Sequence, residues 1–157
     1  MIQRIQTLYL MAVTLLMVVT LIFPLVFIGV DGHQVTLSAF TISDGEGILS
    51  YATSWLGAVL CLTTALPFVT IFLYKNRQLQ IRLCGVQCAL LLGAVVLVGA
   101  FTYSVCNNIF ADFDITWSNL AFRFPIIMPL ISLVLTLLAM RAILRDELLV
   151  RSLDRIR

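Results

Sequence analysis

Four cysteines and one histidine are the residues of this chain best suited to bind a metal or act as nucleophiles. Cys84 and Cys88 are four residues apart, which places two thiols on one face of a helix. Two thiolates fall short of the four ligands of a structural zinc site, and no C-x-x-C motif is present. We therefore expect no metal site and no catalytic residue, and we interpret these two, Cys61 and Cys106 as small apolar packing residues.

Oxygen-bearing side chains gather in a second segment, at Asn107, Asn108, Asp112 and Asp114. Carboxylates and amides are ligands that calcium prefers, but this spacing matches no compact calcium loop. A solvated loop is the simpler interpretation, and the same holds for His33 against a role as a pH sensor. We expect no cofactor.

The elements that must position these residues are strongly apolar. Of 157 residues, 61% are hydrophobic and only 11% are charged, and the mean hydropathy is +1.07. A soluble domain has about 25% charged residues. A domain this short could not hide such an apolar excess from water, so the sequence predicts a membrane protein.

Four apolar stretches have interiors without Asp, Glu, Lys, Arg or His. Since a helix needs about 20 residues to span the bilayer, we expect an all-α membrane protein of one domain, a bundle of four transmembrane helices. The expected helices are at about 5–24, 53–74, 82–105 and 122–145. The first is too long for a secretory signal and lacks an A-x-A site, which favours an uncleaved helix. Proton relays and ion-coupled transporters place ionisable groups inside the bilayer, so their absence argues against both.

Orientation follows from the bias of Lys and Arg toward the cytoplasm. With a cytoplasmic amino terminus, nine of the ten cations are inside, namely Arg4, Lys75, Arg77, Arg82, Arg141, Arg145, Arg151, Arg155 and Arg157. Only Arg123 falls outside. We expect a multi-pass protein of the cytoplasmic (inner) membrane with both termini inside and an inner turn at about 75–81. The basic surface would meet anionic headgroups, so the expected partners are membrane lipids and no nucleic acid.

The first outer segment predicts a β-hairpin at about 25–43. Asp31-Gly32 is a two-residue turn signal, and Val35, Leu37 and Ala39 alternate with polar residues, the period of a half-buried strand. The second outer loop alternates from Asp112 to Trp117 and predicts a third strand. The expected extracytoplasmic part is thus a small hairpin or three-stranded antiparallel sheet, and a loop in the headgroup region is the alternative.

The carboxy-terminal segment, about 145–157, continues the fourth helix. Leu144, Leu148, Leu149, Leu153 and Ile156 recur at helical spacing among arginines. We interpret it as a cytoplasmic helix that protrudes or meets the headgroups. A docking helix for a cytosolic partner is the alternative.

Gly85, Ala89 and Gly93 form a face of small residues, which lets helices approach closely in lipid. The partner is either another helix of this chain or a second molecule in the bilayer. Among intramembrane polar residues, threonines are expected to bond their own helix, whereas Gln87 needs a partner within the bundle. Pro67 frees a backbone carbonyl in the second helix.

Three segments resemble a known family. They are "MIQRIQTLYL" at the start, "KNRQLQIRLC" at the inner turn and "RAILRDELLVRSLDRIR" at the end. They are similar to the four-helix membrane family catalogued as domain of unknown function 4293. The resemblance implies a bacterial cytoplasmic-membrane protein of a Gram-negative lineage. It carries over no activity, cofactor or site residue.

These features favour a non-enzymatic subunit or scaffold of a membrane complex, with a protein partner or self-association in the bilayer. A small oligomeric transporter or channel is the alternative, although four helices leave little room for an aqueous path. A thiol-based membrane enzyme acting through Cys61 and Cys106 is a third hypothesis.

Overall fold

The computed structural model describes residues 3–30, 33–44, 47–50, 53–73, 76–109, 120–122 and 124–154. These residues contain four long helices, α1 (Gln3–Ile22), α2 (Ser54–Phe72), α3 (Arg77–Ile109) and α4 (Met128–Asp154). Each helix is long and apolar enough to cross a membrane. The prediction of a mainly helical protein with four membrane-capable helices is confirmed.

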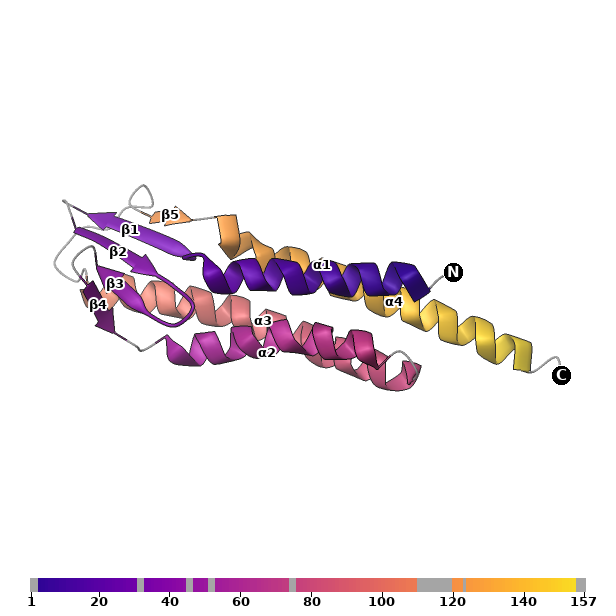
Figure 1. Ribbon diagram of the computed structural model, residues 1–157. Helices are drawn as coiled ribbons and strands as arrows, with labels where there is room; N and C mark the ends of the chain where they lie inside the picture. The colour runs from indigo at the N-terminus through magenta and orange to yellow at the C-terminus, as the bar shows by residue number, and fades with distance from the viewer. Residues whose placement is uncertain are drawn as a thin grey trace.

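The four helices form an antiparallel bundle (Figure 1). Helix α1 packs against α2 and α4, and α3 packs against the same two helices. The amino-terminal end of α1, the α2–α3 connection and the carboxy-terminal end of α4 lie at one end of the bundle, and a small sheet lies at the other. We call these the terminal end and the sheet end.

Within the described residues, the sheet has five antiparallel strands in the order β4-β3-β2-β1-β5. The strands are β1 (Val26–Val30), β2 (His33–Leu37), β3 (Ile42–Asp44), β4 (Gly47–Ser50) and β5 (Leu120–Phe122). Val26 pairs with Leu37 on one side and with Phe122 on the other. One face of the sheet is buried, with Val26, Ile28, Val35 and Leu37 at most 2% exposed. That face packs in one apolar cluster with α1, α2 and α3.

The predicted hairpin and antiparallel sheet are present. Strands β1 and β2 form the hairpin, and β5, which follows the second loop, pairs beside β1. The Asp31-Gly32 turn and the alternating segment 112–117 lie outside the described residues. Strands β3 and β4 extend the sheet beyond the predicted three strands. They have three and four residues, too few to show an alternating pattern.

Two helix ends differ from the expected ranges, the end of the first helix and the start of the fourth. Helix α1 ends at Ile22 because Phe23 precedes Pro24, and a residue before proline avoids the helical region. The fourth helix does not begin at 122, since Leu120–Phe122 is a strand and Phe124–Ile127 forms a 3₁₀ turn, η2, before α4.

The expected inner turn at 75–81 is too long. Helix α3 begins at Arg77, because the Asn76 carbonyl accepts the backbone N–H of Leu79 and of Gln80, both at 3.1 Å. Asparagine is among the preferred residues for starting a helix.

The connection between β2 and β3 rests on α2 through Phe40 and Gly57. A Cβ at Gly57 would overlap the Phe40 ring and lie 3.0 Å from the carbonyl oxygen of Ala39. Only glycine permits this approach without displacing the ring. The contact therefore fixes the sheet against the start of α2.

Candidate functional site

The cysteines do not form a reactive cluster in the described part of the chain. Cys84 is buried, Cys88 is half-buried and Cys61 is exposed on the outside of α2, and all three are free thiols. Cys106 lies near the end of α3. Among the described residues, no three His, Cys, Asp or Glu side chains come together as a metal site. His33 starts β2, and Asp112 and Asp114 lie outside the described residues.

The described residues of the bundle core form two apolar clusters. The larger one lies toward the sheet end and includes Met17, Leu60 and Leu91. The smaller one lies toward the terminal end and contains Leu10, Cys84, Ala139 and Ile143.

Polar residues occupy the core positions between the two clusters. They are Thr63 on α2, Gln87 on α3 and Thr136 on α4, each at most 2% exposed. We call these three residues the polar layer. It contains no ionisable group, so it supplies hydrogen bonds and no charge.

A cross-helix hydrogen bond joins α2 and α3 in the polar layer. The side-chain N–H of Gln87 donates to the carbonyl oxygen of Thr63 at 2.7 Å. That carbonyl lies four residues before Pro67, which has no backbone N–H to offer it. Gln87 therefore satisfies the acceptor that the proline frees, and the expectation that Gln87 finds a partner inside the bundle is confirmed.

A second glutamine makes an equivalent link nearer the terminal end. The buried side-chain N–H of Gln80 donates to the carbonyl oxygen of Thr70 at 3.0 Å. Helix α2 ends at Phe72, so Thr70 is among its last residues, whose carbonyls lack a helical partner. Two glutamines, two helical turns apart on α3, thus bind two free carbonyls of α2.

The hydroxyl groups of the core bond mostly within their own helices, as expected from the sequence. Thr14, Thr20, Thr63, Thr64, Thr70, Thr102 and Thr136 each donate to a backbone carbonyl three or four residues earlier. Four buried polar atoms make no hydrogen bond within the described part of the protein. They are Gln6 Nε2, Thr53 Oγ1, Gln87 Oε1 and Ser132 Oγ.

The small-residue face of α3, Gly85, Ala89 and Gly93, points away from the bundle. All three residues are exposed, and a Cβ at Gly85 or Gly93 would meet no atom within 4 Å. The interpretation as a contact between helices of this chain is therefore wrong. The bundle uses the opposite face of α3, where Leu91 and Ala94 are fully buried. A contact with a second molecule stays a prediction.

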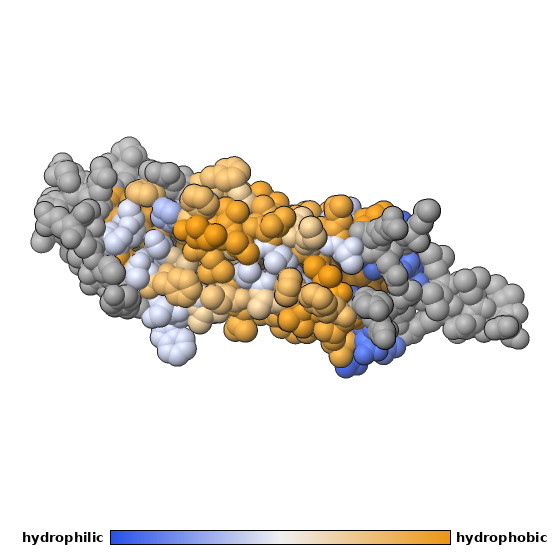
Figure 2. All heavy atoms as spheres, in the orientation of Figure 1, coloured by the Kyte–Doolittle hydropathy of each residue, from blue (hydrophilic) through white to orange (hydrophobic). Residues whose placement is uncertain are grey.

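The predicted basic surface gathers at the terminal end. Arg82, Arg141 and Arg145 are exposed there, and hydrophilic residues border the hydrophobic belt at that end in Figure 2. Arg77 starts α3 and Arg151 lies in the last turn of α4. Lys75 and Arg155 lie outside the described residues.

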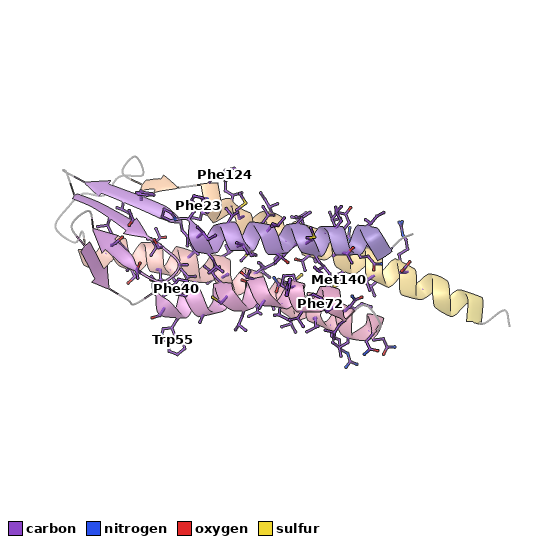
Figure 3. The ribbon with its side chains drawn as sticks, viewed as in Figure 1. Phe23, Phe40, Trp55, Phe72, Phe124 and Met140 are labelled. Carbon is purple, nitrogen blue, oxygen red and sulfur yellow. The ribbon has the colours of Figure 1, made fainter. Side chains whose placement is uncertain are left out.

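Exposed aromatic side chains lie around the bundle at the sheet end. Phe23, Trp55 and Phe124 are 54%, 79% and 70% exposed, and they lie where the helices meet the sheet (Figure 3). Aromatic residues are typical of the boundary between hydrocarbon and headgroups. Large apolar side chains, including Leu8, Leu15 and Val96, cover the outside of the bundle between the two ends.

Sequence reasoning missed Gln80 as a structural residue. The spacing could have identified it, since Gln80 and Gln87 are seven residues apart and share a face of an apolar helix. The spacing of Thr63 and Pro67 likewise marks the carbonyl that needs an outside donor.

The hydrogen bonds of Gln80 and Gln87 hold α2 and α3 together. No curated protein sequence matches this chain. The model of the family described as a domain of unknown function (DUF4293) matches residues 2–156. The chain therefore belongs to the DUF4293 family.

Proposed function

We propose that this protein is a non-enzymatic subunit or scaffold in a complex of a bacterial cytoplasmic membrane. The observation that carries the proposal is the contrast between an apolar bundle surface and a core whose middle holds uncharged polar groups. Its outside is apolar on every helix, as in Leu15, Phe68, Val96 and Val134, while the described polar groups buried in its middle are neutral amides and hydroxyls. The buried carboxylate of Asp146 lies toward the terminal end, in the carboxy-terminal part of α4. Neutral groups that link helices suit a stable bundle better than proton or ion transfer.

The terminal end is the cytoplasmic end in this proposal, and both chain termini are inside. The support is the positive-inside rule together with the exposed Arg82, Arg141 and Arg145 at that end. The sheet would then lie on the outer side of the membrane, with Phe23, Trp55 and Phe124 at the headgroup level.

The last turns of α4 would extend into the cytosol. Helix α4 continues in line with the bundle past the neighbouring helices (Figure 1), with Leu144 and Leu148 39% and 67% exposed. This direction favours a protruding helix over one that lies flat among headgroups.

The small-residue face of α3 is the surface on which a membrane partner or a second copy would lie. Glycine and alanine let another helix approach closely, and van der Waals packing is a main force of association in lipid. The bundle itself leaves Gly85 and Gly93 open. Many outward positions elsewhere carry larger groups, such as Leu8, Leu62 and Leu130, although α2 also exposes Ala58 and Ala65.

Copurification from native membranes tests the proposal. A tagged full-length chain, extracted after mild crosslinking, should recover a stoichiometric protein partner or a second copy. Ala89→Leu should weaken that recovery, whereas Ala65→Leu, a matched change on the outside of α2, should not. Isolation of the wild type as a lone monomer, or equal recovery from both variants, would contradict the proposal.

A small transporter or channel remains the alternative function. The polar layer lies between two apolar clusters, which is unfavourable for a continuous aqueous path. Purified protein in liposomes should therefore show no ion or solute flux above that of empty liposomes. Reproducible flux would favour the alternative.

A further inference from the structure

We propose that the polar layer is a binding site for water, held by the side-chain oxygen of Gln87 in the middle of the bundle. Gln87 is 2% exposed, and its Oε1 is a buried acceptor without a hydrogen bond from any described residue. It lies nine residues inside the span Gln78–Val105, about 13 Å along the helix axis. The site goes beyond the proposed function and does not depend on it.

The orientation of the Gln87 amide is determined by its partner. The Thr63 carbonyl can only accept, so the nitrogen of Gln87 must face it and the oxygen must point elsewhere. A flipped amide would bring two acceptors together. The unpartnered oxygen therefore follows from the cross-helix bond.

The two hydroxyl groups of the polar layer, those of Thr63 and Thr136, already donate hydrogen bonds within their own helices. Thr63 donates to Leu60 at 2.9 Å, and Thr136 donates to the carbonyl of Ser132 at 2.7 Å. The hydroxyl of Ser132, one turn from Thr136 and fully buried, is itself without a partner among the described residues. A buried polar group left unsatisfied costs about 1–3 kcal/mol, so both atoms favour an additional ligand.

Water is the ligand class that fits this chemistry. It can donate to Gln87 Oε1 and keeps a second hydrogen and its lone pairs for other polar groups, and buried waters usually make about three such hydrogen bonds. An ion is unfavourable because the layer has no charge to balance it. The apolar clusters on both sides would confine the water to the layer.

Water-edited solid-state NMR of the full-length protein in bilayers tests this site. Polarisation from water should reach the side chains of Gln87 and its partner Thr63 several-fold faster than those of Leu60 and Leu91, which belong to the larger apolar cluster. Gln87→Met should slow the transfer to Thr63, whereas Gln80→Met should leave it unchanged.

Transfer to Gln87 in the wild type as slow as to Leu91 would show that the layer is dry and would overturn the proposal. Equally fast transfer to Leu10, Leu60 and Leu91 would show a continuous aqueous path and would overturn it too. The wild-type measurement decides the matter even if a variant fails to fold.

Discussion

The side-chain nitrogen of Gln87 in α3 lies 2.7 Å from the carbonyl oxygen of Thr63 in α2. This amide group replaces the backbone N–H that Pro67 cannot supply. A proline that would weaken α2 alone thus becomes the point at which α3 is bound to it. In lipid, no solvent is available to satisfy a freed carbonyl, so the partner must come from the protein.

The first prediction concerns this pair. Gln87→Leu should lower the free energy of unfolding in bicelles by about 1–2 kcal/mol, since it leaves the Thr63 carbonyl unsatisfied. In a Pro67→Ala background the same change should cost clearly less, because an alanine in place of the proline returns a backbone N–H to that carbonyl. Equal costs in the two backgrounds would show that the carbonyl is not what Gln87 serves.

A second prediction concerns the end of α2. Gln80→Leu removes the donor to Thr70 and should fray the last turn of the helix, at a cost of about 0.6 kcal/mol. Hydrogen exchange should accelerate at residues 70–73 and stay unchanged near Ser54. Unchanged exchange at both ends would argue against this role.

How much of the fold the sequence predicts depends on how many residues each hydrophobic pattern spans. The four long apolar stretches and the alternation around Val35 and Leu37 predict the helices and the hairpin. Strands of three or four residues, such as Ile42–Asp44, leave no readable period. The end of α1 could be read from Pro24, whereas the 3₁₀ turn before Met128 could not.

Which side of each helix faces the bundle core is harder to predict from the sequence. Between Leu83 and Phe101 every face of α3 is apolar apart from Gln87, so the small residues fit an inner or an outer position equally well. The buried glutamines decide it, because amide groups are expensive in lipid and turn inward. Gly85 and Gly93, on the opposite face, therefore point outward.

A third prediction uses two adjacent residues of α3. Ala94 is fully buried and Gly93 is exposed. Ala94→Leu should destabilise the bundle by about 1–3 kcal/mol through overpacking, while Gly93→Leu should leave the unfolding free energy of the monomer nearly unchanged. Thermal unfolding in detergent compares them. A larger loss for Gly93→Leu would place the small-residue face inside the bundle.

A fourth prediction concerns the contact between Phe40 and Gly57. Gly57→Ala should destabilise the protein by about 1–3 kcal/mol, because the new methyl group overlaps the aromatic ring. Adding Phe40→Ala should recover part of the loss. Gly85→Ala serves as the matched control: it gives the same gain in helix propensity in open space and should be neutral or stabilising. If Gly57→Ala behaves like this control, the sheet does not rest on α2 through this contact.

Cysteine accessibility in intact cells of a bacterial host tests the membrane arrangement most directly. Two full-length variants are needed, Ser38→Cys in the β2–β3 connection and Leu148→Cys on the exposed side of α4. A membrane-impermeant maleimide should label Ser38→Cys at once and Leu148→Cys only after the membrane is opened. Labelling of Leu148→Cys in intact cells, or protection of Ser38→Cys, would contradict a bundle that spans the membrane with both termini in the cytoplasm.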